Sequence, residues 1–165
     1  MRRLVLLTVL VLGLAVPAAA FGLVYGVDDG TLSVRNGNGR VSLNFNGSVV
    51  ARISHGWIRV TDPVLTDGAG FDFWGCDNTR VDRSDTTAVC SGNNIRFRAV
   101  GGKYQVYVKG SGMYLSAVGH GTAVLDGRGE TPYVDYDGVF SFNDEPYRSL
   151  PNAPTPYELA APSGG

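Results

Sequence analysis

The chain contains little histidine and little cysteine, and beyond its first residues it has no long hydrophobic run. Its 165 residues include two cysteines, and its only histidines are His55 and His120. The sequence Gly-x-Ser-x-Gly does not occur, and with two histidines no serine-nucleophile triad can be assembled by spacing. These absences leave catalysis without a named residue, so the sequence favours a protein that is not an enzyme.

Helical periodicity is also missing outside the N-terminal segment. That segment has Arg2-Arg3, a continuous apolar stretch over residues 4–16, and Pro17 followed by alanines up to Ala20. This order predicts a secretory signal peptide over residues 1–20, cleaved after Ala20. The apolar stretch is shorter than the roughly 20 residues that a membrane-spanning helix needs. We therefore expect a secreted or extracytoplasmic protein with no transmembrane segment after cleavage; a membrane anchor is the alternative.

Charged residues are sparse, and the two signs are separated along the chain. They make up 18% of the sequence, and the formal net charge of −1 becomes −3 when Arg2 and Arg3 leave with the signal peptide. Such a balance gives no general preference for nucleic acid or anionic membranes. Within residues 31–61 and 91–125, however, every charged side chain is arginine or lysine, and acidic residues are confined to the connections and the tail.

Two segments of the chain repeat one pattern. Residues 32–48 align without a gap with residues 95–111 at an offset of 63, and the match continues to His55-Gly56 against His120-Gly121. The alignment predicts a duplicated folding unit within a single all-β domain over residues 21–150. Repeat one covers about 31–62, and repeat two covers about 94–127.

Apolar and polar residues alternate strictly in 40–46, 95–99 and 103–109. A period of two predicts strands with one buried and one solvated face. Further strands are expected at 32–35, 49–54, 57–61, 113–118, 122–126 and 139–142, and glycines between them predict tight hairpin turns. Two duplicated four-strand units indicate an antiparallel sandwich or partly closed barrel. A β-solenoid is the alternative, because glycines recur about every nine residues.

The segment between the repeats, residues 63–90, is predicted to be a disulfide-bearing connection. Two cysteines in an exported chain, Cys76 and Cys90, indicate one disulfide; a metal pair or a reactive thiol is the alternative. Aspartates recur at five-residue intervals from Asp62, at Asp67, Asp72, Asp77 and Asp82. We interpret them as part of a solvated loop. The alternatives are a calcium site and the acid–base pair of a glycan hydrolase.

The histidines occupy equivalent predicted turns in the two repeats. A pseudo-two-fold axis could bring His55 and His120 together as metal ligands. Histidine before glycine in a turn needs no ligand to explain it, so we expect no metal and no cofactor.

Cations lie beside aromatic residues on the predicted solvated strand faces. Such a surface suits sugars, acidic polysaccharides or teichoic-type polymers, through stacking and charge-assisted hydrogen bonds. The predicted ligand-binding residues are Arg52, Trp57, Arg59, Lys103, Tyr107 and Lys109. The alternative is a solvated β surface on which arginine stems cover apolar area.

The last part of the chain, residues 151–165, contains four prolines and ends in two glycines. This composition predicts a flexible tail.

The second repeat and the segment after it carry a resemblance to a known group. The chain resembles uncharacterised small secreted proteins of high-GC Gram-positive bacteria at Ile95-Arg96-Phe97-Arg98, Gly101-Gly102-Lys103-Tyr104, Leu115-Ser116-Ala117-Val118-Gly119, Leu125-Asp126-Gly127 and Ser149-Leu150-Pro151. The resemblance implies export and a β fold, and it carries over no catalytic residue.

Taken with the strand faces, the sequence predicts a secreted non-catalytic binding or interaction module at the cell envelope or outside the cell. The expected partner is a cell-envelope glycan or anionic polymer, without specific binding of nucleic acid. The alternatives are a glycan hydrolase that uses carboxylates of the connection, and a purely structural β module.

Overall fold

The computed structural model describes residues 28–64, 68–82, 86–127 and 137–162. The predicted signal peptide lies outside these residues. Every regular element in the described part is a strand: β1 (Gly30–Thr61), β2 (Gly70–Trp74), β3 (Asn78–Asp82), β4 (Thr87–Gly127), β5 (Val139–Phe142), β6 (Arg148–Ser149) and β7 (Thr155–Leu159). All pairings are antiparallel within one seven-stranded sheet. The predicted all-β antiparallel fold is therefore confirmed.

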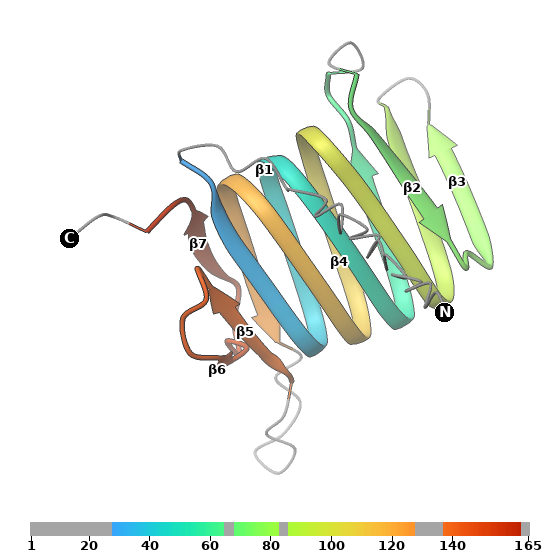
Figure 1. Ribbon diagram of the computed structural model, residues 1–165. Helices are drawn as coiled ribbons and strands as arrows, with labels where there is room; N and C mark the ends of the chain where they lie inside the picture. Colours follow the sequence, from blue (N-terminus) through green and yellow to red (C-terminus); the bar gives the residue numbers. More distant parts are fainter. Residues whose placement is uncertain (1–27, 65–67, 83–85, 128–136, 163–165) are drawn as a thin grey trace, which may run out of the picture.

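Strands β1 and β4 are very long, with 32 and 41 residues, and they wind around a common axis (Figure 1). Residues in the middle of β1 pair with two residues of β4, one on each side. Val41, for example, lies opposite Val108 on one side and Leu125 on the other. Because Val108 and Leu125 are 17 positions apart, β4 returns to the same side of the coil after that number of residues.

The coil is flattened into two layers. The first layer consists, in spatial order, of β7, residues 121–127, 40–46, 103–109, 57–61 and 87–91, and β3. The second layer consists of β6, β5, residues 30–35, 113–119, 48–54 and 95–100, and β2. The sheet does not close on itself, which agrees with the predicted sandwich or partly closed barrel. Like a solenoid, the chain coils, but its neighbouring turns run antiparallel.

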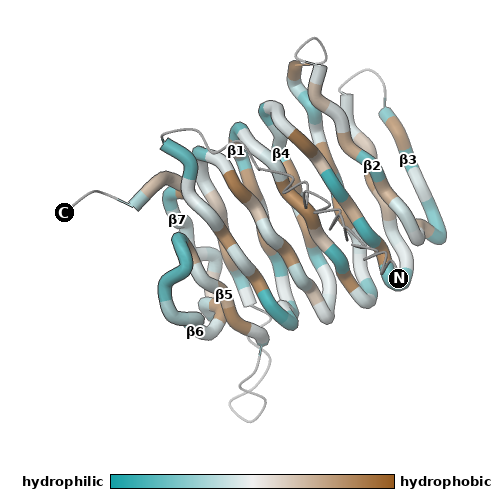
Figure 2. The backbone as a smooth tube through the Cα atoms, viewed as in Figure 1, coloured by the Kyte–Doolittle hydropathy of each residue, from teal (hydrophilic) through white to brown (hydrophobic). Residues whose placement is uncertain are grey.

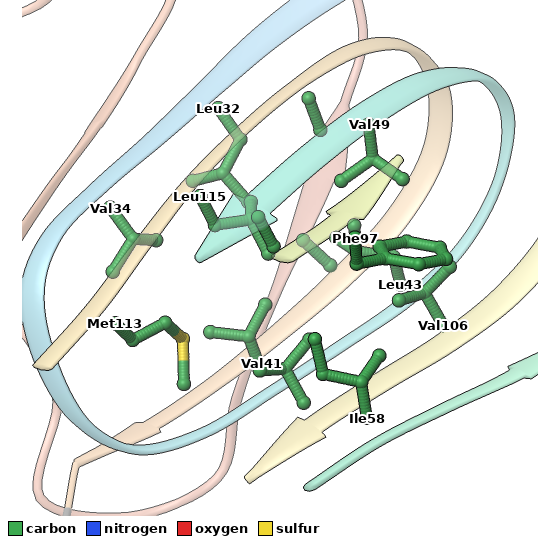
Figure 3. Packing of buried hydrophobic residues seen from close by; sticks show 14 of the residues in the cluster. Leu32, Val34, Val41, Leu43, Val49, Ile58, Phe97, Val106, Met113 and Leu115 are labelled. Atoms are coloured by element: carbon green, nitrogen blue, oxygen red, sulfur yellow. The ribbon is translucent and has the colours of Figure 1, made fainter. Parts of the chain in front are cut away.

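The core lies between the two layers. Leu32, Val49 and Leu115 of the second layer point toward Val41, Leu43 and Val106 of the first layer, and all six are almost completely buried (Figure 3). Hydrophobic and hydrophilic residues alternate along the coil (Figure 2). The period of two that predicted the strands therefore also identified the side chains that face the core.

The glycines do not form the hairpin turns that we predicted. Gly47 and Gly56 lie inside β1, with φ angles of +154° and +141°, where the strand bends from one layer to the other. A Cβ atom on Gly56 would overlap the carbonyl oxygen of Lys109 on the neighbouring turn. Glycine is needed here because the backbone bends and the next turn of the coil passes very close. The bend continues the strand around the coil and does not reverse it.

Two segments predicted to be irregular are strands. Within the predicted connection, β2 pairs with residues 96–100 and β3 with residues 87–91 of β4. Within the predicted flexible tail, β7 pairs with residues 121–125, and its Leu159 is fully buried. These strands give hydrogen-bond partners to the outer turns of the coil, which would otherwise be exposed sheet edges. The frequent aspartates and prolines obscured this pairing.

The predicted disulfide is present. Cys76, between β2 and β3, is bonded to Cys90 of β4, with a Cα–Cα distance of 5.4 Å. The bond ties the β2–β3 turn to the body of the sandwich.

Candidate ligand-binding surface

A row of arginine and aromatic side chains crosses the outer face of the second layer. Trp74 of β2 pairs with Arg96, Arg96 pairs with Arg52, and Arg52 pairs with Tyr114. On the next strand, Val34 pairs with Leu115. Arg35, which follows Val34, therefore lies beside Tyr114 and extends the row. Neighbouring strands are about 4.8 Å apart, so the four steps from Trp74 to Arg35 span about 19 Å.

This row lies in a shallow groove of about 850 Å³, which we call the arginine–aromatic groove. Its lining includes four arginines, the three of the row and Arg98, together with Trp74 and Tyr114. None of the described residues that line it is aspartate or glutamate. The groove therefore combines an excess of positive charge with aromatic surface.

Two aromatic residues of the groove, Trp74 and Tyr114, retain much of their surface. Trp74 is 49% exposed and Tyr114 is 43% exposed. The Arg52 guanidinium lies over the Tyr114 ring, 5.1 Å from its centroid. This cation–π contact holds the arginine against the sheet and leaves its N–H groups available for a ligand.

The charges of the groove are only partly compensated. Arg98 forms an ion pair with Asp72 at 2.9 Å, and both side chains are more than half exposed. Arg35 lies 4.3 Å from the centroid of the Tyr147 ring. Among the described residues, Arg35, Arg52 and Arg96 have no carboxylate partner. An anion entering the groove would therefore meet cations that are not already neutralised.

The structure brings together four of the six residues predicted from sequence. Trp57 and Tyr107 stack with ring centroids 4.9 Å apart, and Arg59 lies 5.6 Å from the Tyr107 centroid. Lys109 is the cross-strand partner of Trp57. All four belong to the outer face of the first layer.

The other two predicted residues lie elsewhere. Lys103 shares the outer face of the first layer, but it is four positions along the strand from Tyr107, about 14 Å at the rise of an antiparallel strand. Arg52 belongs to the second layer, where it contributes to the arginine–aromatic groove. The sequence order, with Arg52 five residues before Trp57, concealed the bend at Gly56 that separates them.

Of the four arginines and two exposed aromatic residues of the groove, sequence reasoning missed five, namely Arg35, Trp74, Arg96, Arg98 and Tyr114. A partial signal was available, because the alternation in residues 95–99 already directs Arg96 and Arg98 toward solvent. Trp74 was assigned to a loop. Its place beside Arg96 depends on the pairing of β2 with β4.

The aspartates of the predicted connection have different surroundings. Asp72 is ion-paired with Arg98, and Asp77 accepts a hydrogen bond of 3.2 Å from the Asn93 side-chain amide. Asp62 is buried and accepts a hydrogen bond of 3.0 Å from the backbone N–H of Val64. Asp67 lies outside the described residues. The calcium and hydrolase interpretations stay predictions.

The two histidines occupy separate positions on the coil. Nδ1 of His55 lies 2.9 Å from Oδ1 of Asn93, and Nδ1 of His120 lies 2.9 Å from Oδ1 of Asp29. Each histidine has its own polar partner, from a different part of the chain. In the part of the chain that the structure describes, no three histidine, cysteine, aspartate or glutamate side chains form a group suited to a metal ion.

Comparison with protein-family models, with curated proteins and with solved structures finds no match for this chain. The resemblance to small secreted bacterial proteins therefore stays a prediction. No helix among the described residues is long and apolar enough to cross a membrane.

Proposed function

We propose that this protein is a secreted, non-catalytic binding module for anionic glycans at the cell envelope or outside the cell, and that the arginine–aromatic groove is its ligand site. The observation that carries the proposal is the row from Trp74 to Arg35, in which cations and exposed rings follow one another from strand to strand. Its length of about 19 Å suits several units of an extended polymer.

The two kinds of side chain in the row have complementary roles. Guanidinium groups recognise carboxylate, sulfate or phosphate groups through paired N–H donors. An exposed ring such as Trp74 offers an apolar face to the C–H face of a sugar. A polymer with both features, an acidic glycan, matches the groove better than a neutral glycan or a small anion does.

The disulfide supports a glycan over a nucleic acid. Stacking rings beside a positive groove also occur in proteins that bind single-stranded nucleic acids. The Cys76–Cys90 bond, however, is typical of proteins that act in an oxidising compartment outside the cytosol. Acidic polysaccharides are abundant polyanions there.

The test is retention on an immobilised carboxylate polymer, polygalacturonate, with neutral dextran as the control matrix. The double change Arg52→Gln and Arg96→Gln removes two charged contacts, each worth about 1.5–3 kcal/mol. We expect at least a tenfold rise in the Kd of the arginine–aromatic groove for the polymer, and a weaker salt dependence of the remaining binding. Arg80→Gln is the matched control, since Arg80 is an exposed arginine of β3 in the first layer. Unchanged retention of the double variant would contradict the proposal.

Two further measurements separate the alternatives. Single-stranded DNA and free polygalacturonate are added as competitors at equal concentrations of charge. If DNA displaces the protein from the immobilised glycan and free polygalacturonate does not, the glycan assignment is wrong. The length of the polymer is followed over time. Shortening that Asp72→Asn abolishes would identify a hydrolase and refute the non-catalytic assignment.

A further inference from the structure

The outer face of the first layer carries a second group of cations and aromatic rings. We define it as the first-layer cluster: Trp57, Tyr107, Arg59, Lys109 and Arg40. It is formed by three adjacent strand segments, because Lys109 pairs with Arg40 on one side and with Trp57 on the other, and Arg59 pairs with Tyr107. These residues come from two strands that are distant in sequence, and the winding of the coil brings them side by side.

The cluster is held in place by its own contacts. The Trp57 and Tyr107 rings are nearly parallel, with an interplanar angle of 18°. The Arg40 guanidinium donates a hydrogen bond to Asp126, and this bond raises the pKa of Arg40. Arg59 rests against Tyr107. Two of the three cations are thus positioned before any ligand arrives, which reduces the entropy lost on binding.

The charge of the cluster is also in excess. Its cations are Arg40, Arg59 and Lys109, and among the described residues Asp126 is the one carboxylate that forms an ion pair with them. Beside Arg40 and Lys109 the surface forms a polar hollow of about 700 Å³, whose lining also includes Asp126, the partner of Arg40, and the polar residues Asn38, His55, Ser111 and Asn152. Amide and hydroxyl groups of this kind suit the hydroxyls of a sugar. The hollow and the cluster together match one or a few acidic sugar units.

We propose that the first-layer cluster is a second site for the same anionic glycan, so that one molecule bridges two polymer chains. This proposal rests on the proposed function of the arginine–aromatic groove. The two sites lie on the outer faces of opposite layers, and the core between the layers is about 10 Å thick. Their ligands approach from opposite directions, so two polymer chains can bind at the same time.

The test measures bridging directly. Beads carrying polygalacturonate are incubated with the protein and then with fluorescent soluble polygalacturonate. The fluorescence captured on the beads measures the protein molecules that bind the immobilised and the soluble polymer at the same time. The wild type should capture the soluble polymer. Lys109→Gln combined with Trp57→Ala should still bind the beads but capture at least tenfold less. Calorimetry with a short oligogalacturonate should give two sites in the wild type and one in this variant.

If Trp57→Ala impairs folding, two single variants provide the test. Lys109→Gln changes the first-layer cluster, and Lys103→Gln is its matched control. Both lysines are exposed residues of the same outer face of β4, and both changes remove one positive charge. Capture should fall for Lys109→Gln and stay at the wild-type level for Lys103→Gln. Thermal unfolding confirms that each variant is folded.

The outcomes distinguish the two proposals. One oligosaccharide site per wild-type molecule, or full capture by the folded first-layer variants, would overturn bridging and leave the groove as the single site. Failure of the wild type to bind any anionic glycan would overturn the proposed function, and the second site with it. Equal losses for Lys109→Gln and Lys103→Gln would indicate diffuse charge attraction and would also refute a built second site.

Discussion

Replacement of Leu159 with alanine should destabilise the protein, although composition alone suggests a flexible tail at this position. The Leu159 side chain is fully buried in the core, and its backbone pairs with Gly121. Two residues earlier, the Tyr157 ring packs against Phe140 and Phe142, with centroid distances of 5.2 and 5.1 Å. Strand β7 is therefore fixed to the sandwich by both backbone and side-chain contacts.

The magnitude follows from the atoms removed. Leucine loses three carbons on conversion to alanine, which corresponds to about 2.4 kcal/mol of transfer free energy at about 0.8 kcal/mol per carbon. The cavity that remains adds to this cost, and Leu→Ala changes in cores span about 2–5 kcal/mol. Because β7 is an edge strand that can partly relax into the space, we expect a value of about 2–3 kcal/mol.

Urea unfolding followed by tryptophan fluorescence measures the effect. With an m-value of about 1.5–2 kcal/mol/M, the midpoint should fall by about 1–2 M. Glu158→Ala, at the exposed neighbour of Leu159 in β7, is the control and should change stability by at most about 0.5 kcal/mol. Equal midpoints for both variants and the wild type would refute the docking of β7 and restore the flexible tail.

Three further changes test the disulfide, the core and a bend. Cys76→Ser should cost about 3 kcal/mol by opening the loop to Cys90, and alkylation of both thiols in the wild type without reductant would contradict the bond. Phe45→Ala should lower the free energy of unfolding, measured in urea, by about 3–5 kcal/mol. No change would mean that the Phe45 side chain does not face the core. Gly47→Ala should lower Tm far more than Gly70→Ala. A Cβ on Gly47 overlaps the Val118 carbonyl oxygen, whereas a Cβ on Gly70 meets no atom within 4 Å. Equal Tm values would argue against the bend at Gly47.

The sequence was sufficient to predict most of β1, β4 and β5 as strand and to predict which of their side chains face inward. Alternation identified residues 40–46, 95–99 and 103–109, and the strand over Val139–Phe142 is β5. Such alternation can be read from a short stretch of sequence, because it depends only on which face of the strand is buried. The disulfide was also predictable, because two cysteines allow a single intramolecular pairing.

The pairing of strands could not be predicted, because no local pattern records which turn of a coil lies next to another. Glycine is common both in hairpin turns and in bends, so Gly47 and Gly56 suggested reversals of the chain where the strand in fact continues. This error placed Arg52 beside Trp57. Trp74 was left in a loop because the pairing of β2 with β4 was not foreseen. Once β1 and β4 are wound together, Arg52 lies between Arg96 and Tyr114.

The interleaving of β1 and β4 also determines how the protein can fold. Gly30 pairs with Gly119 and Val49 with Ala99, so the turns of the coil close only when distant parts of the chain meet. The entropy of closing such large loops is lost before the contacts can stabilise the structure, a situation associated with slow folding. Neither half of the chain can bury its apolar face without the other, because residues 40–46, 48–54 and 57–61 of β1 each lie between two turns of β4. The two repeats, although alike in sequence, therefore form one cooperative unit that folds as a whole.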